Sequence, residues 1–145
     1  MSTGKAHATA SVLAAPAMGL TLIFLVTPEI GVGAFLGCLL GVVLTPDLDQ
    51  ITISKSEWWI VRYVPVVGWL WMALWDLYAR LIPHRSFWSH APIVGTAGRL
   101  LYLGTIASLR WSVLPMLSIV WVQGAILGLA ASDTIHCLMD LGGKK

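Results

Sequence analysis

Long apolar stretches alternate with short polar ones along most of the chain. A helix that crosses a bilayer needs about 17–25 mostly apolar residues, and four stretches meet or approach that length. They cover residues 8–27, 30–45, 91–109 and 113–132. The pattern therefore predicts four transmembrane helices. Glycines spaced by four residues in the second and fourth stretches indicate close helix packing.

The stretch over residues 57–83 follows another pattern, in which aromatic and charged residues are mixed. Pro65 and Gly68 interrupt it. Because Trp and Tyr favour the headgroup zone of a membrane, we expect an interfacial or re-entrant helical segment here. A fifth transmembrane helix is the alternative. The residues that set this pattern are Trp58, Trp59, Arg62, Tyr63, Trp69, Trp71, Trp75, Asp76, Tyr78 and Arg80.

Composition agrees with a membrane protein. Of the 145 residues, 57% are hydrophobic and only 11% are charged, whereas about a quarter of a soluble domain is charged. So few charges cannot cover a soluble surface, and we expect an all-α membrane protein of one domain, residues 1–145. The net charge of +2 and the scattered basic residues argue against a nucleic-acid partner.

The polar motifs decide between the two topologies. If residues 57–83 do not cross, the segments around residues 47–49, 84–90 and 133–140 all reach the membrane face at which the chain starts. If they do cross, these motifs are separated by about 30 Å of hydrocarbon. We prefer the first arrangement, which also gathers most Lys and Arg residues on the motif face. The positive-inside rule then predicts a multi-pass inner (plasma) membrane protein with the motifs and both termini in the cytoplasm.

Histidine and aspartate dominate these motifs. Neutral imidazole and carboxylate together suit zinc, manganese or iron. In the last motif the histidine and the final aspartate are four residues apart, which places them on one helix face. We expect one or two divalent ions, zinc before manganese or iron. A two-metal site is preferred, and a single ion with supporting carboxylates is the alternative. The expected ligands are His7, Asp47, Asp49, His84, His90, His136 and Asp140.

Three further charged residues lie near these motifs. Arg85 adjoins His84 and either holds a substrate phosphate or carboxylate or anchors the topology. Asp133 is the expected general base. Arg99 falls inside a predicted transmembrane stretch, where it either extends toward the surface or lines the cavity of the site.

The order of these motifs resembles the YdjM-like family of inner-membrane-associated, metal-dependent hydrolases. The likeness runs from His7 through Pro46-Asp47-Leu48-Asp49 and the two ends of the segment 84–90 to His136 and Asp140. A related bacterial group of metal-binding proteins is more similar still, because it shares the Trp-rich stretch. The resemblance implies a membrane-bound metal site at the ligands named above. A looser likeness to the all-helical zinc phospholipases and nucleases hints at phosphoester chemistry, but this chain lacks their second HxxxD motif.

The main hypothesis is a metal-dependent hydrolase that acts on a lipid or membrane-proximal phosphoester, with Asp133 and Arg85 as catalytic residues. In it, membrane lipid is the partner and a lipid-like molecule the substrate. The alternatives are a non-catalytic metal-binding membrane protein and a partner-binding membrane subunit. The sequence is silent on the oligomeric state.

Overall fold

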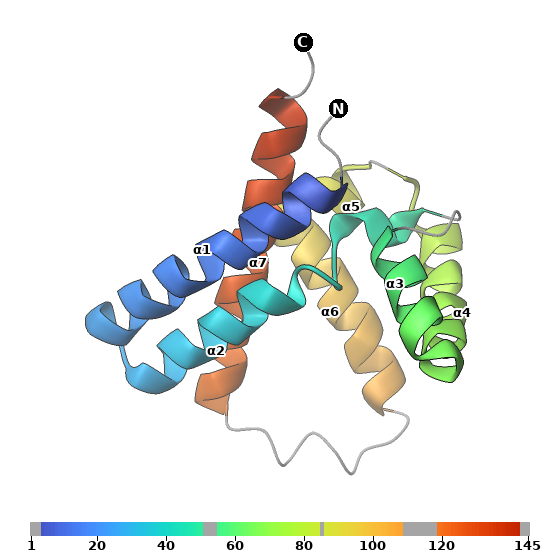
Figure 1. Ribbon diagram of the computed structural model, residues 1–145. Helices are drawn as coiled ribbons and strands as arrows, with labels where there is room; N and C mark the ends of the chain where they lie inside the picture. The colour runs from blue at the N-terminus through green and yellow to red at the C-terminus, as the bar shows by residue number, and fades with distance from the viewer. Residues whose placement is uncertain (1–3, 51–54, 85, 109–118, 143–145) are drawn as a thin grey trace.

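The computed structural model describes residues 4–50, 55–84, 86–108 and 119–142, and it is all-helical there (Figure 1). The all-α prediction is therefore confirmed. The elements are α1 (Gly4–Leu25), α2 (Pro28–Leu40), the short 3-10 helix η1 (Pro46–Asp49), α3 (Lys55–Tyr63), α4 (Pro65–Leu81), α5 (Phe87–His90), α6 (Pro92–Ser108) and α7 (Ile119–Gly142).

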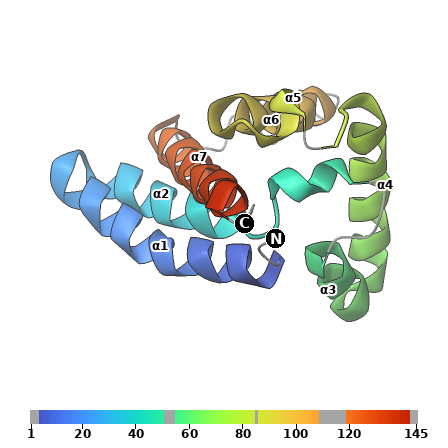
Figure 2. The same cartoon turned by 90° about the horizontal axis from the view of Figure 1, so that it is seen from above.

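Helices α1, α2 and α7 form one layer of closely packed helices on the left of Figure 1, and in Figure 2 α1 and α2 run side by side while α7 is seen nearly along its axis. Small residues make this approach possible. A Cβ added to Gly37 would overlap the carbonyl of Ala125, and one added to Gly128 would overlap the carbonyl of Ala34. The two backbones therefore touch at the glycine positions that the sequence indicated.

The Trp-rich stretch folds into a helical hairpin. Helix α3 ends at Tyr63 and α4 begins at Pro65, because proline fits the first turn of a helix but not its interior. At Gly68 an added Cβ would overlap the backbone of Val61, so the two arms lie against each other. The position of this hairpin relative to a membrane stays a prediction.

An aromatic cluster connects the hairpin to the rest of the chain. Trp75 and Tyr78 of α4 are almost fully buried with Leu48 of η1. Tyr102 of α6 joins them, and its hydroxyl donates a hydrogen bond of 2.5 Å to the carbonyl of Leu74. The cluster thus fixes η1, with its two aspartates, between α4 and α6.

The prediction of four transmembrane helices is wrong. Among the described residues, two helices, α1 and α7, are long and apolar enough to cross a bilayer, judged by length and composition alone. Helix α2 has 13 residues, or about 20 Å at 1.5 Å per residue, and stops short of the predicted end at Thr45. Helix α6 has 17 residues and buries Arg99. Residues 113–118 of the fourth predicted stretch lie outside the described residues.

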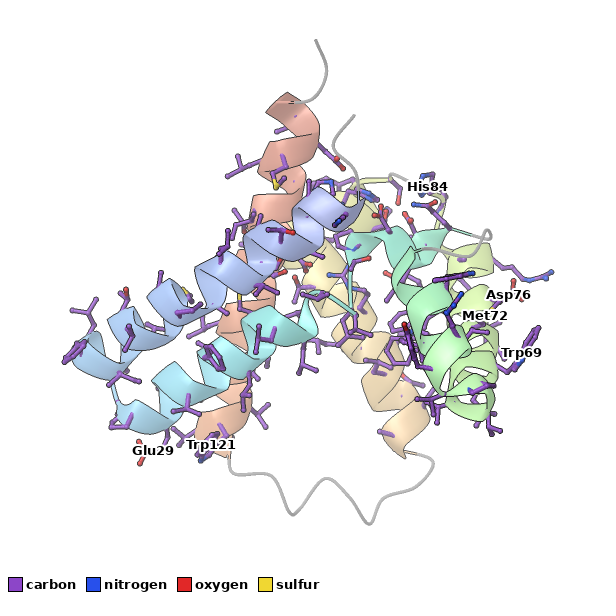
Figure 3. The ribbon with its side chains drawn as sticks, viewed as in Figure 1. Glu29, Trp69, Met72, Asp76, His84 and Trp121 are labelled. Atoms are coloured by element: carbon purple, nitrogen blue, oxygen red, sulfur yellow. The ribbon has the colours of Figure 1, made fainter. Side chains whose placement is uncertain are left out.

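The ends of the helices bring the polar motifs together. The start of α1, the end of α7, α5 and η1 all lie in the upper part of the view in Figure 1, where both termini also lie. Figure 3 shows His84 in this part, whereas Glu29 and Trp121 mark the opposite end. The motifs that the sequence analysis assigned to one membrane face therefore lie at one end of the molecule.

Candidate metal centre

Each expected ligand is delivered by the end of a helix or by a short turn. His7 lies in the first turns of α1, and His136 and Asp140 lie in the last turns of α7. Thr45 is extended before Pro46, so the chain turns into η1 there and presents Asp47 from a 3-10 turn. His90 ends the single turn of α5. These four segments converge although they are far apart in the sequence.

The first ligand group is His7, His136 and Asp140, whose ligand atoms lie within 4.8 Å of one another. The Asp140 carboxylate faces Nε2 of both imidazoles. One oxygen is 3.2 Å from Nε2 of His7, and the other is 3.6 Å from Nε2 of His136. The two rings stack, with centroids 3.8 Å apart and planes 12° apart. Both histidines are buried.

The second ligand group is Asp47, His90 and His136, and it uses the same nitrogen of His136. Oδ1 of Asp47 is 3.7 Å from Nε2 of His136 and 3.9 Å from Nε2 of His90. The rings of His90 and His136 meet edge to face, 6.0 Å apart. The two groups therefore form one continuous row of five ligand residues with His136 at its middle.

These separations fit metal ligands better than they fit hydrogen bonds. Nitrogen and oxygen ligands at about 2.1 Å from a tetrahedral ion lie about 3.4 Å apart, whereas an N–H···O hydrogen bond spans about 2.9 Å. Nε2 of His90 and Nε2 of His136 are both buried without a hydrogen-bond partner in the part of the chain that the structure describes. Buried polar atoms are rarely left this way, and one ion in the group Asp47, His90 and His136 would satisfy both nitrogens.

Asp49 and His84 lie beside the row rather than in it. Asp49 is 1% exposed, and its Oδ1 lies 2.7 Å from Nδ1 of the largely exposed His84. Its Oδ2 lies 3.5 Å from Nδ1 of His90. This carboxylate therefore faces Nδ1 of both imidazoles. A carboxylate beside the second ring nitrogen is the usual group that orients a metal-ligating histidine.

The family comparison agrees with this geometry. The family described as "Uncharacterized metal-binding protein (DUF2227)" matches residues 2–141. The chain belongs to this family. The search of curated proteins and the search of solved structures each found no match. Membership of DUF2227 confirms the expected likeness to a group of metal-binding proteins, whereas the likeness to the YdjM-like hydrolases stays a prediction.

The two expected catalytic residues have different outcomes within this DUF2227 chain. Arg85 lies outside the described residues. Asp133 is 1% exposed, and one of its oxygens accepts hydrogen bonds from the Arg99 guanidinium and the Thr96 hydroxyl. Arg99 is buried in this ion pair and does not extend to the surface.

Two polar residues of this region stood outside the expected ligands: Tyr78, to which the sequence assigns no role, and Ser89, for which the sequence favours a part in positioning the turn or the metal shell. Ser89 is 1% exposed, and its hydroxyl lies 2.9 Å from Nδ1 of His90. The phenol of Tyr78 is buried near Arg99, and this burial is the main cause that raises its pKa, so the hydroxyl stays protonated. Ser89 had one signal in the sequence, its place immediately before a candidate ligand.

Proposed function

We propose that this protein binds one or two divalent metal ions at the row His7, Asp140, His136, Asp47 and His90, next to a membrane. The observation that carries the proposal is the pair of buried imidazole nitrogens, on His90 and His136, that face carboxylates at 3.6–3.9 Å. The name of the family supports it independently.

The donor set constrains the ion. Imidazole nitrogens and carboxylate oxygens suit zinc, manganese or iron. The described part of the row contains no thiolate, so a soft ion such as Cu(I) is disfavoured. Because both groups use Nε2 of His136, and this nitrogen has one lone pair, only one ion at a time can bind it. If two ions bind, one ion has all three ligands of its group, and the second ion has only the two ligands of the other group that remain without His136.

The surface of the chain supports contact with lipid. Large apolar side chains are strongly exposed on several helices, among them Phe24 of α1 (83%), Ile93 of α6 (78%) and Val66 of α4 (73%). Exposed apolar area on this scale marks an interaction site or a membrane. We propose that the apolar helices α1 and α7 insert into the inner membrane and that the metal centre lies at its cytoplasmic face, with the basic residues.

Elemental analysis of detergent-purified protein tests the metal proposal. The protein would be extracted from the membrane fraction, dialysed against metal-free buffer and measured by mass spectrometry for zinc, manganese and iron. We expect between one and two equivalents of a single metal per chain. Less than 0.1 equivalent, before and after loading with each ion, would reject the proposal.

A metal-dependent hydrolase is the second candidate, because the row is partly open. The side chains of Asp47 and Asp140 are 23% and 24% exposed, so solvent reaches both ligand groups. These residues would hold a divalent ion that would supply an acidified water, with a pKa of about 7. Among the chain's own residues, Asp49 would hold His84 and His90 in place. Asp133, which is buried in an ion pair with Arg99, would stabilise the fold around the site.

Turnover distinguishes the two candidates. Metal-loaded protein would be offered lipid phosphoesters in mixed micelles, beside an Asp47→Asn variant. Turnover that the variant loses would favour the hydrolase. No turnover, or equal turnover in both proteins, would leave metal binding without catalysis as the function.

A further inference from the structure

We propose that Ser89 is a positioning residue that fixes the tautomer of His90, and that the buried Arg99–Asp133 ion pair holds Ser89 in place. In the selected tautomer the proton is on Nδ1 and the lone pair is on Nε2, where the second ligand group needs it. The inference about metal affinity rests on the proposed metal binding, whereas the tautomer itself can be measured without any metal.

The neighbours of Nδ1 identify the protonated nitrogen. The Ser89 hydroxyl oxygen lies 2.9 Å from Nδ1 of His90, and the Asp49 carboxylate lies 3.5 Å from it. An ionised carboxylate can only accept, so a proton on Nδ1 is the arrangement that suits both neighbours. The Ser89 hydroxyl then accepts from Nδ1 and directs its own proton to the carbonyl of Ser86, 3.2 Å away. It also lies 3.4 Å from the Ser86 hydroxyl.

Opposite Nδ1, the ring presents its other nitrogen to the ligand row. Nε2 of His90 is buried, has no hydrogen-bond partner among the described residues and lies 3.9 Å from Oδ1 of Asp47. Metal-ligating histidines usually donate their second N–H to an oxygen that fixes tautomer and ring orientation. Ser89 fills this role for His90.

The Arg99–Asp133 ion pair contacts Ser89 at its backbone carbonyl. One guanidinium nitrogen of Arg99 donates to the carbonyl of Ser89 at 3.4 Å, and the other pairs with Asp133, which also accepts from Thr96. A Cβ added to Gly95 would overlap the carbonyl of Ser89, so the α6 backbone touches Ser89 as well. The serine is thus held at its carbonyl and at its hydroxyl.

A buried charge pair is costly to form and gains little stability over an apolar pair of the same volume. Asp133 lies one turn before His136 on α7, and Arg99 reaches the residue next to His90. The pair therefore connects the segments that supply two ligands of the second group. A pair that only joined α6 to α7 would not need to contact Ser89.

The first experiment reads the tautomer of His90 in the full-length, metal-free protein. Selective labelling with ¹⁵N-histidine gives two ring shifts per residue, and a His90→Asn variant assigns the His90 signals. We expect a protonated Nδ1 and an unprotonated Nε2 in the wild-type protein. In Ser89→Ala, signals of the opposite tautomer should appear. A wild-type ring protonated on Nε2, or a Ser89→Ala spectrum unchanged at His90, would overturn the proposal.

The second experiment measures Co²⁺ affinity by competition with a chromophoric chelator. Loss of an orienting partner typically lowers metal affinity 10–100-fold, so we expect a loss of that size in Ser89→Ala. Ser86→Ala is the matched control, because the carbonyl of Ser86 remains as the acceptor for Ser89, and it should stay within about threefold of wild type. Wild-type affinity in Ser89→Ala would contradict the proposal. If the wild-type protein binds no Co²⁺, the proposed metal function fails, and the ring shifts still decide the tautomer.

Discussion

His136 is the ligand that both groups share, and its removal gives the sharpest test of the metal centre. The substitution His136→Ala takes away the one nitrogen that lies 3.7 Å from Asp47 and 3.6 Å from Asp140. Loss of His7 or of His90, in contrast, leaves the other group of three intact. We therefore expect His136→Ala to weaken metal binding more than either of the other two substitutions.

The magnitude follows from the number of ligands. Structural zinc sites with four ligands bind with about 10–16 kcal/mol, or roughly 3 kcal/mol per ligand. At about 1.4 kcal/mol per tenfold change in Kd, one lost ligand raises Kd roughly 100-fold. In His7→Ala and in His90→Ala, one group of three ligands survives. We therefore expect the Kd of the tighter site to rise less than about tenfold in these two variants.

The assay is a competition titration of zinc against a chromophoric chelator, with far-UV circular dichroism as a check that helix content is retained. Thr134→Ala is the matched control, since Thr134 lies on the same helix and its exposed hydroxyl donates a hydrogen bond to the carbonyl of Ala130. Its Kd should equal that of the wild type. Equal losses in His136→Ala, His7→Ala and His90→Ala would refute the shared-ligand geometry.

Three further predictions concern packing, the buried ion pair and the membrane. Gly128→Ala should lower the free energy of unfolding by about 1–3 kcal/mol, because the new Cβ overlaps α2. Gly104→Ala, with nothing within 4 Å of the new Cβ, should instead stabilise α6 by up to about 1 kcal/mol. Thermal melts in detergent compare the two variants, and equal shifts in Tm would contradict the α2–α7 contact. Asp133→Asn should lower the free energy of unfolding by about 3–5 kcal/mol, because it leaves the Arg99 charge buried without its partner. In urea titrations the double variant with Arg99→Met should recover part of that loss, and no recovery would argue against the ion pair. Leu13→Arg, at a position 72% exposed on α1, should make membrane insertion less favourable by about 3 kcal/mol. An unchanged share of the protein in the carbonate-resistant membrane fraction would refute a membrane-inserted α1.

The candidate ligands could be selected from the sequence because local spacing and chemistry carried the signal. His136 and Asp140 are four residues apart, and on a helix this spacing alone brings them to one face. Pro46 marks the turn that presents Asp47. The convergence of distant motifs followed from a topology argument and not from any local pattern.

The helix ends and the supporting contacts could not be predicted in the same way. Apolar residues continue past Leu40 to Leu44, so composition gives no sign that α2 ends and the chain turns toward η1. The partner of Arg99 is 34 residues away on α7, and no sequence spacing relates the two. A single sequence also gives no means of distinguishing the position of Asp49, which faces Nδ1 of two imidazoles, from that of the candidate ligand aspartates.

The two ligand groups differ in what holds them together, and this difference has a consequence for function. His7, His136 and Asp140 lie on α1 and α7, whose layer is fixed by direct backbone contact through glycines. Asp47 comes from η1, which follows α2 in the chain, whereas His90 comes from α5, where the Ser89 carbonyl accepts a hydrogen bond from Arg99 of the α6–α7 ion pair. The first group therefore depends on the layer of α1, α2 and α7 alone, whereas the second also depends on the contact of α5 and α6 with α7. An ion bound by His90 and His136 would join α5 to α7, so its binding energy would also stabilise that contact.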